Sequence, residues 1–175
     1  MVSDKIKQII RDVPDFPKPG IVFKDITPIL KNAALCNEIA EALAGQLKEI
    51  KVDVVAGIES RGFLFGLALA QKLNVPFVPI RKAGKLPYKT IQQSYDLEYG
   101  SATLEVHEDA FDVGQKVLIH DDLLATGGTV VAASALVQKL GAEIAGYSFL
   151  INLDFLNGKE RLKVYSDKLF SLADY

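Results

Sequence analysis

The segment VLIHDDLLATGGT, residues 117–129, determines which fold this chain can adopt. An apolar run ends in two acidic residues, a turn of small residues follows, and a helix-like pattern begins at Thr129. A strand that leads through such a turn into a helix is typical of open α/β sheets, whose ligands bind at the carboxyl ends of the strands. Unpaired N–H groups at the start of a helix, together with the helix dipole, favour an anion. The segment therefore predicts a phosphate site between a buried strand and a helix.

The sequence on either side alternates between strand-like and helix-like patterns. Short apolar runs predict strands at residues 53–58, 76–80, 115–120 and 144–152, with DDLLATGG after the third as a loop. Apolar spacing near 3.6 residues predicts helices at 33–50, 63–73 and 129–140, and a short one at 3–12 with Ser3 as its N-cap. Strands that alternate with helices form a mostly parallel sheet with helices on both faces. We therefore expect an α/β fold in which residues 1–175 form one domain.

Two stretches interrupt this alternation. Residues 14–20, PDFPKPG, contain three prolines and a glycine and predict a stiff loop. The polar stretch KAGKLPYKTIQQSYDLEY, residues 82–99, precedes a weakly strand-like segment at 101–106. A polar stretch of this length in a compact domain is more often a lid or binding loop than a plain surface hairpin, which is the alternative.

Composition and charge exclude several classes of function. The formal net charge of −2 does not suggest a nucleic-acid-binding surface. Cys36 is the only cysteine, so no intrachain disulfide can form, and two histidines are too few for a typical zinc site. The start, MVSDKIKQII, is unlike a signal peptide, and the longest apolar run, residues 62–70, is too short to cross a bilayer. We expect a cytoplasmic protein without a nucleic-acid or membrane partner.

The turn Ala125–Thr129 has the composition of a site for a terminal phosphate monoester. Gly127 and Gly128 let the main chain approach a ligand closely, and Thr126 and Thr129 add hydroxyl donors. The segment has neither the Gly-Lys-Ser/Thr ending of a Walker A loop nor the spacing of a dinucleotide-binding turn.

Asp121 and Asp122 precede this turn at the end of the predicted strand. Neighbouring residues on an extended chain point opposite ways, so the two carboxylates are expected to differ in role. Carboxylates accept hydrogen bonds from sugar hydroxyls, and the adjacent phosphate turn favours a ribose-binding role. The alternative is that one of them is an N-cap or a solvated loop acid.

These residues resemble a known family. VLIHDDLLATGGT resembles the phosphoribosyl pyrophosphate (PRPP) motif of type I phosphoribosyltransferases, and DDLLATGGT is the form seen in members that act on adenine. Further segments resemble that branch in the same order, namely FPKPGIVFKDITPIL (16–30), GIESRGFLFG (57–66), PIRKAGKLP (79–87) and LEYG (97–100). The resemblance implies the type I fold, with a central mostly parallel sheet flanked by helices. It also implies an N-terminal base-binding hood at about residues 1–32 and a flexible lid at about 82–105.

The resemblance implies a pentosyltransferase that converts adenine and PRPP to AMP and pyrophosphate in purine salvage. The 5′-phosphate is expected at Ala125, Thr126, Gly127, Gly128 and Thr129, and the ribose hydroxyls at Asp121 and Asp122. Pyrophosphate is expected at Ser60, Arg61, Arg81, Lys82 and Lys85. Cations beside a leaving pyrophosphate stabilise the transition state, although each of these side chains taken alone could be a solvated surface group.

The same resemblance places adenine at Val22, Phe23 and Lys24, where backbone groups would pair with the base edge, and packs Leu123 on the ring. A 6-oxo purine reverses one of these hydrogen bonds and should be rejected, because buried groups would be left unpaired. Phe23 could instead be a core residue. Lys24 stands where the family often has arginine, so a stacking role for its side chain is not implied.

By resemblance, Glu98 is the acid/base that relays the imidazole proton of adenine, and Tyr99 helps to close the lid. The residues alone do not separate Glu98 from Glu105 or Glu108. The family further implies magnesium carried by PRPP and pyrophosphate, with no protein ligand named, and a homodimer.

Three functions remain open: the adenine enzyme, the same chemistry on another base, and a PRPP sensor that regulates transcription. The sensor would need a nucleic-acid surface that this composition does not suggest. His120 is a separate departure, because the family usually has an aliphatic residue there. It is either a tolerated substitution or a group whose titration near neutrality tunes the neighbouring aspartates.

Overall fold

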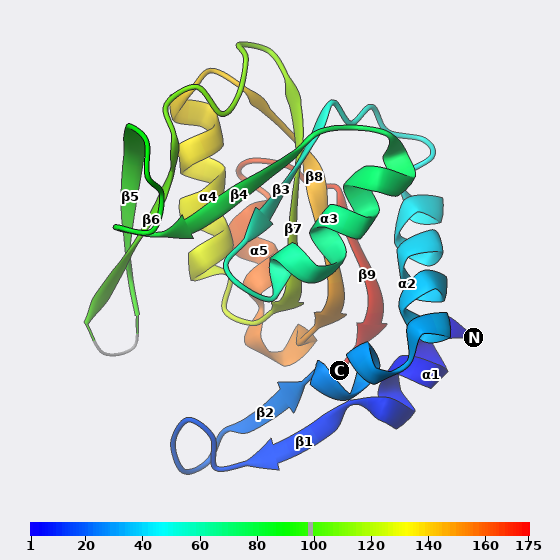
Figure 1. Ribbon diagram of the computed structural model, residues 1–175. Coiled ribbons are helices and arrows are strands. Elements are labelled where there is room, and N and C mark those ends of the chain that lie inside the picture. Colours follow the sequence, from blue (N-terminus) through cyan, green and yellow to red (C-terminus); the bar gives the residue numbers. More distant parts are fainter. Residues whose placement is uncertain (98–99) are drawn as a thin grey trace.

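The described residues, 1–97 and 100–175 of this computed structural model, form a central seven-stranded sheet in the order β5-β6-β4-β3-β7-β8-β9 (Figure 1). The strands from β4 to β9 in that order run parallel, whereas β6 pairs antiparallel with both β4 and β5. The mostly parallel α/β sheet expected from the sequence is confirmed. Its strands are β3 (Val54–Ile58), β4 (Phe77–Lys82), β5 (Thr90–Asp96), β6 (Ser101–His107), β7 (Lys116–Leu124), β8 (Glu143–Asn152) and β9 (Leu169–Asp174).

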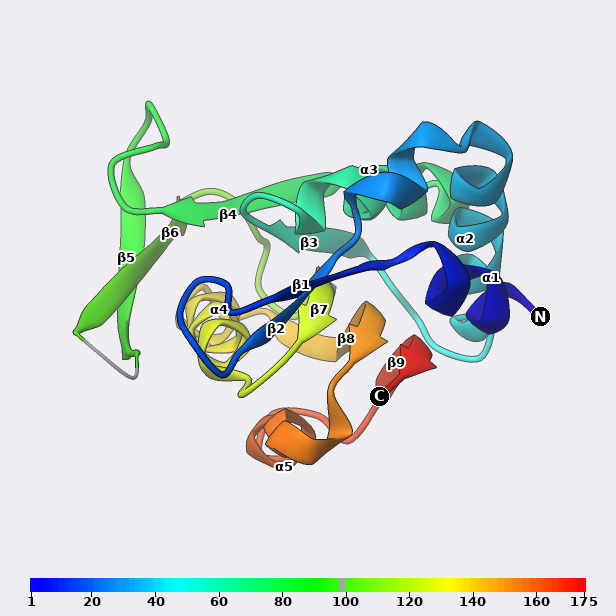
Figure 2. The ribbon, with the colours of Figure 1, turned by 90° about the horizontal axis from the view of Figure 1, so that it is seen from below.

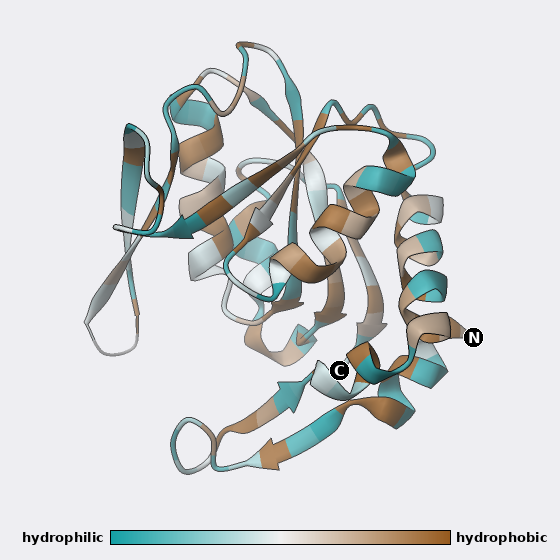
Figure 3. Ribbon diagram, in the orientation of Figure 1, coloured by the Kyte–Doolittle hydropathy of each residue, from teal (hydrophilic) through white to brown (hydrophobic). Residues whose placement is uncertain are grey.

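Helices cover both faces of the parallel part of this sheet (Figure 2). One face carries α1 (Val2–Ile9), α2 (Ala33–Gln46) and α3 (Gly62–Leu73), and the other carries α4 (Gly128–Lys139) and the short α5 (Gly158–Leu162). Apolar residues concentrate in the strands and the helix faces between these layers, drawn in brown in Figure 3. Among the described residues, no helix has the length and apolar character that a membrane span needs.

Strand β7 connects the two buried layers. Val117 and Ile119 pack in the cluster beneath α4, whereas Leu118 packs with α2 and α3 on the opposite face. This alternation follows from the two-residue period of a strand. β7 runs directly into the predicted phosphate turn, and its place between β3 and β8 puts that turn inside the sheet and not at an outer strand.

The N-terminal residues form a separate hairpin beyond the carboxyl ends of the parallel strands (Figures 1 and 2). Its strands are β1 (Arg11–Pro14) and β2 (Val22–Asp25), and the 3-10 helix η1 (Thr27–Lys31) leads from β2 to α2. A second short 3-10 helix, η2 (Asp154–Leu156), follows β8.

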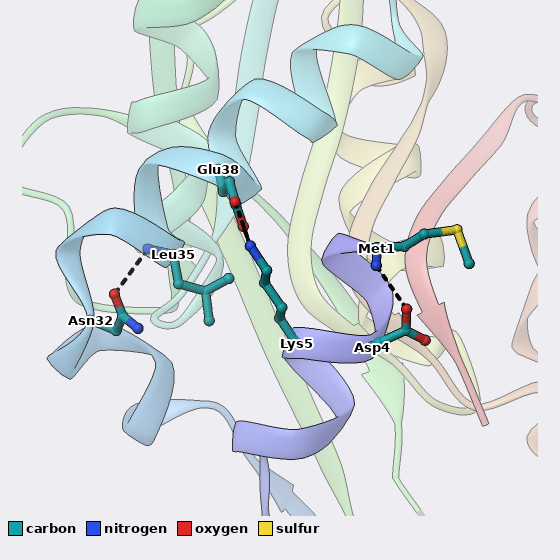
Figure 4. Close-up of polar contacts among 6 residues, drawn as sticks. All are labelled: Met1, Asp4, Lys5, Asn32, Leu35 and Glu38. Atoms are coloured by element: carbon teal, nitrogen blue, oxygen red, sulfur yellow. Dashed lines mark hydrogen bonds and ion pairs between the residues drawn. The ribbon is translucent and has the colours of Figure 1, made fainter.

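The helix α1 anchors this hairpin to α2. Figure 4 shows Lys5 of α1 reaching Glu38 of α2, with 2.6 Å between Nζ and Oε1, and the Asn32 side chain accepting from the Leu35 N–H at the start of α2. The ion pair is exposed, and such pairs contribute about 1 kcal/mol or less. Burial of Ile6, which has no exposed surface, therefore contributes more to holding α1 in place.

Some element boundaries differ from those predicted. The helix predicted at 3–12 spans Val2–Ile9 with Met1 at its N-cap, so Ser3 lies inside it, and residues 11–14 form β1 instead. Residues 11–14 pair instead with β2, which takes them out of the helix. The helix predicted at 33–50 ends at Gln46.

The loop predicted from Asp121 begins only after Leu124. Leu123 and Leu124 continue the β7 ladder by pairing with Ile151 and Asn152 of β8. Polar residues suggest a loop in the sequence, but here backbone pairing with a neighbouring strand extends the strand through them.

Candidate active site

The turn Ala125–Thr129, which we call the phosphate loop, connects β7 to α4. Gly127 is the N-cap of α4 and has φ of +82°, a left-handed conformation that favours glycine. The backbone N–H groups that follow it lie at the start of a 12-residue helix. The predicted combination of a glycine turn and a helix N-terminus is therefore present.

A cavity of about 410 Å³ lies against the phosphate loop. Residues from three separate segments line it, namely the loop between β1 and β2, the end of β5, and the phosphate loop. They are Pro17, Lys18, Ile21, Tyr95, Asp96, Leu97, Thr126, Gly128 and Thr129. The Thr129 hydroxyl donates to the Tyr95 hydroxyl of β5 at 3.3 Å, which joins the hairpin of β5 and β6 to the phosphate loop.

The phosphate loop is supported from outside by α5. A Cβ added at Gly158 would lie 2.2 Å from the Ala125 carbonyl oxygen and 3.1 Å from the Gly127 nitrogen. Arg161 donates from Nη1 to the Thr126 carbonyl at 3.1 Å. Sequence reasoning missed both residues, because neither belongs to a local motif and both lie some thirty positions after the loop.

Asp121 and Asp122 lie at the end of β7 and differ in exposure. Asp122 is buried and Asp121 is half-buried, and the Asp121 carboxylate accepts from the Asp122 N–H at 2.8 Å. Burial raises the pKa of both carboxyls, and the charge of Asp122 raises that of Asp121 further. The Arg61 guanidinium, with Nε 3.0 Å from Asp122 Oδ2, opposes this shift at Asp122.

The turn containing Ser60 and Arg61 follows β3 and leads into α3. β3 and β7 are adjacent and parallel, so their carboxyl ends meet at one edge of the sheet. A Cβ at Gly62 would lie 3.0 Å from Asp121 Oδ1, which shows how closely the start of α3 approaches the acidic pair. The structure thus brings Ser60 and Arg61 to the predicted ribose site.

Arg61 also joins this edge to the N-terminal hairpin. Its Cζ lies 4.7 Å from the centroid of the Phe23 ring, and Phe16 meets the same ring edge-on at 5.2 Å. Phe23 is half-buried and belongs to neither of the buried apolar clusters formed by the described residues. The alternative of a core role for Phe23 is therefore wrong.

The other residues expected at the base are placed as follows. Val22 is half-exposed on β2, and Leu123 is half-buried one residue past Asp122. The Lys24 ammonium lies 2.7 Å from Asp12 Oδ1 and 4.4 Å from the centroid of the Tyr175 ring. The side chain of Lys24 is thus engaged with these two residues, and its backbone remains the part expected at the base.

The segment Arg81–Lys85, which we call the cationic loop, begins with the last two residues of β4 and continues past its carboxyl end, at the same edge of the sheet. Glu59 accepts from Arg81 Nε at 3.1 Å and from the Lys82 N–H at 3.0 Å. Burial alone would raise the pKa of Glu59, but these donors hold it below its usual value. Arg81 also donates from Nη1 to the Lys85 carbonyl at 3.1 Å. Two of the three guanidinium nitrogens of Arg81 are therefore engaged in hydrogen bonds with other protein groups.

Glu98 and Tyr99 lie outside the described residues. The stretch on either side of them forms the antiparallel hairpin of β5 and β6, and Leu97 donates its N–H to the Gly100 carbonyl at 3.0 Å. Tyr95, Asp96 and Leu97, immediately before Glu98 in the chain, line the cavity.

The structure does separate the two other acids considered for the acid/base role. Glu105 is 2% exposed, and its carboxylate accepts hydrogen bonds from the backbone of Lys85 and Leu86. Glu108 is partly exposed, with its carboxylate 4.0 Å from the Lys89 ammonium on the surface. Among the described residues, neither acid lines the cavity.

His120 is fully buried and uncharged at neutral pH. Its Nδ1 lies 3.2 Å from the Ser148 hydroxyl, and Nε2 has no hydrogen-bond partner among the described residues. Burial lowers the pKa of His120 to about 3, slightly opposed by Ser148. The hypothesis that His120 titrates near neutrality is therefore wrong, and the tolerated substitution remains.

This burial predicts an acid-dependent loss of stability. The unfolded chain, with a histidine pKa of about 6.5, binds a proton that the folded protein excludes, so the free energy of unfolding falls as pH drops below 6.5. From pH 7 to pH 5 this amounts to about 2 kcal/mol. Urea unfolding at pH 7 and pH 5 measures this loss, and we expect the free energy of unfolding of His120→Val to fall by about 2 kcal/mol less than that of the wild type. His107→Val is the control. The pH–rate profile of His120→Val should be unchanged. An equal loss in His120→Val and the wild type would contradict the assignment.

The comparisons with known proteins agree with this geometry. The sequence profile of the phosphoribosyl transferase domain matches residues 24–172. The chain is 51% identical over 175 residues to an adenine phosphoribosyltransferase of Cytophaga hutchinsonii, covering 100% of this chain and 97% of that protein. The crystal structure of the Thermoanaerobacter pseudethanolicus adenine phosphoribosyltransferase superposes with a TM-score of 0.96 at 50% identity, covering 100% of both chains. The Saccharomyces cerevisiae enzyme, solved with adenine and an imino-altritol bisphosphate, gives 0.90 at 41% identity, covering 98% of both.

Proposed function

This chain belongs to the phosphoribosyltransferase family, and from that premise we propose a place for each part of the reaction in the site described above. The protein converts adenine and PRPP to AMP and pyrophosphate, the reaction of purine salvage carried out by its adenine-specific relatives. The observation that carries the site assignment is the cavity shared by the N-terminal hairpin, the β5–β6 hairpin and the phosphate loop.

The phosphate loop, Ala125 to Thr129, binds the 5′-phosphate. The left-handed Gly127 and the start of α4 support this assignment, because they present unpaired N–H groups at the positive end of a helix. Thr126 and Thr129 line the cavity and can add hydroxyl donors.

Asp121 and Asp122 bind the ribose hydroxyls. Their position between the phosphate loop and the turn after β3 supports this role, because the ribose must lie between the 5′-phosphate and the pyrophosphate. Ser60, Arg61, Lys82 and Lys85 hold the pyrophosphate. We assign Arg81 to orienting the cationic loop that binds pyrophosphate, since its contacts with Glu59 and the Lys85 carbonyl occupy two of its nitrogens.

Adenine binds between β2 and Leu123. Backbone groups of Val22, Phe23 and Lys24 accept from the 6-amino group and donate to N1, and Phe23 offers its ring face. Arg61, already against that ring, places the base next to the reacting end of the ribose. Residues 1–32 act as the hood and residues 82–105 as the lid of one domain spanning 1–175.

The reaction proceeds by displacement at C1 of the ribose. The bond from C1 to N9 of adenine forms as the bond to pyrophosphate breaks, and the electron pair leaves with pyrophosphate. The sugar passes through an oxocarbenium-like state. The cations beside the leaving pyrophosphate stabilise the negative charge that develops on it. Glu98 accepts the imidazole proton of adenine through N7, and Tyr99 helps the lid to exclude water from PRPP.

Magnesium enters with its substrate. Among the described residues, no three histidine, cysteine or acidic side chains are grouped closely enough to hold a metal ion. The acids at the ribose end, Asp121 and Asp122, nonetheless fit a cation carried by phosphate oxygens and water, the ligands that magnesium prefers. When bound with PRPP, magnesium would neutralise charge on the pyrophosphate, and Arg61, Lys82 and Lys85 would add to this effect.

The active form is a homodimer in the cytoplasm. Leu64 and Leu67, one turn apart on α3, are 46% and 49% exposed, which gives the chain an uncovered apolar strip for a second copy. A solution mass of twice that of the chain is the check for the dimer. The highly charged PRPP and AMP do not cross a bilayer unaided, which supports the cytoplasmic location, and cell fractionation tests it.

A panel of bases tests the proposed function. With PRPP and magnesium, we expect AMP from adenine and a kcat/KM at least about 10⁴-fold lower for hypoxanthine, guanine and xanthine, because a 6-oxo group leaves a backbone acceptor unpaired. Comparable turnover of a 6-oxo purine would contradict the base site. Tight PRPP binding without turnover of any base would instead indicate the sensor.

A further inference from the structure

Glu105 of β6 is a buried acid that the proposed reaction does not use. Its Oε1 accepts from the N–H groups of Lys85 and Leu86, both at 2.8 Å. Its Oε2 accepts from the Thr90 hydroxyl at 3.3 Å and the Gln92 amide at 3.2 Å. Burial would raise the pKa of Glu105, but the backbone donors of the loop lower it to about 2. The side chain therefore stays charged throughout the physiological range.

The donors of Glu105 come from two segments with different tasks. Lys85 is the last residue of the cationic loop, and Leu86 follows it. Thr90 and Gln92 belong to β5, the first strand of the β5–β6 hairpin. One carboxylate thus connects the proposed pyrophosphate-binding loop to the lid hairpin.

The backbone of Lys85 is held from both sides. Glu105 accepts from its N–H, and Arg81 donates to its carbonyl. Arg81 is held in turn by Glu59, which lies next to Ser60 in the turn after β3. A continuous chain of contacts therefore runs from that turn, through the cationic loop, to the hairpin.

A buried carboxylate is costly to desolvate unless its hydrogen-bonding capacity is used. Here that capacity is used to aim backbone N–H groups and not to line the cavity. A neutral acceptor of the same shape would hold the N–H groups less strongly, because hydrogen bonds to a charged acceptor are roughly twice as strong.

We propose that Glu105 is a positioning residue that fixes the cationic loop in the geometry that receives pyrophosphate and ties this loop to the β5–β6 hairpin. The proposal rests on the assignment of Lys85 to pyrophosphate made above. Glu105 does not line the cavity among the described residues, so we expect its effect on binding of the pyrophosphate end of PRPP and not on the bond-making step.

The test compares Glu105→Gln with Glu108→Gln, the same substitution on the surface three residues later. For Glu105→Gln we expect the KM for PRPP and the inhibition constant of magnesium pyrophosphate to rise about tenfold. The KM for adenine should change less than twofold and kcat only slightly. Glu108→Gln should match the wild type. Hydrogen exchange of the amides of residues 84–86 should accelerate only in Glu105→Gln.

A second variant covers the case in which Glu105→Gln does not fold. The double change Thr90→Val with Gln92→Leu leaves the carboxylate and its loop contacts but removes the link to β5. We expect a smaller rise in the same two constants, because Glu105 loses its two hydrogen bonds from β5 but keeps those from Lys85 and Leu86.

Two results would overturn the proposal. One is identical PRPP and pyrophosphate constants in Glu105→Gln and Glu108→Gln. The other is an equal loss in both substrates' KM and in kcat, which a general structural defect produces. Lys85→Ala distinguishes failure of the pyrophosphate assignment from failure of the positioning role. Unchanged inhibition by pyrophosphate in Lys85→Ala would refute the assignment of Lys85 to pyrophosphate. Weakened inhibition in Lys85→Ala with a normal Glu105→Gln refutes only the positioning role.

Discussion

Replacing Gly158 with alanine is expected to lower kcat/KM for PRPP by about 100-fold. The added Cβ would lie 2.2 Å from the Ala125 carbonyl oxygen, and real Cβ contacts are never that short, so the backbone of the phosphate loop must shift. A displacement of about 1 Å at a binding group costs on the order of 10²-fold in rate. Steady-state kinetics with PRPP varied at saturating adenine measures the effect.

Gly45→Ala is the matched control for this substitution. Gly45 lies in α2, and a Cβ there meets no described atom within 4 Å, so we expect unchanged kinetics and a gain of about 0.5–1 kcal/mol from helix propensity. Circular dichroism is the check that both variants are folded. If folded Gly158→Ala binds PRPP as the wild type does, α5 does not define the shape of the phosphate loop.

Replacing Glu98 with glutamine is expected to lower kcat by about 10²–10⁴-fold with little change in either KM. The amide keeps the size of the side chain but cannot accept the imidazole proton of adenine. The acidic limb of the kcat profile should also flatten, because protonation of this carboxyl no longer inactivates the enzyme. Pre-steady-state measurement of AMP formation reports the chemical step directly.

Glu108→Gln again provides the control, because it removes a surface carboxylate from the same hairpin region. We expect its kcat to equal that of the wild type. A kcat in Glu98→Gln within about threefold of the wild type would remove Glu98 from the chemistry and leave positioning and electrostatics as the source of catalysis.

The parts of the fold that the sequence predicted are those with a strong local pattern. The buried strands are short continuous apolar runs, and the three long helices have apolar spacing near 3.6 residues. β1 and β2 have four residues each, too few for a period to show, and β9 carries a mixed pattern typical of a sheet edge. β7 extends four residues beyond its predicted end at residue 120. Asp121 and Asp122 have the composition of a loop, but the strand continues through them by pairing with β8.

The site divides in the same way. The phosphate loop, the acidic pair and the turn with Arg61 lie in contiguous motifs, and the parallel order of β3 and β7 brings their ends together. The supporting residues Glu59 and Glu105 act through backbone groups of other segments, as Gly158 does. No spacing in the chain marks such a partner, because the relation exists only after folding.

The attachment of the β5–β6 hairpin bears on how this family can diversify. Among the described residues, β6 meets β4 at two register pairs, Arg81 with Glu105 and Lys82 with Leu104. The parallel strands β4, β3, β7, β8 and β9 pair with one another without β6. Insertions or deletions in the chain between Lys82 and Leu104 would lengthen or shorten the lid without displacing any of the parallel strands. We therefore expect length differences among related enzymes to gather in this hairpin, away from the residues that line the cavity, while the junction of Arg81 with Glu105 stays fixed.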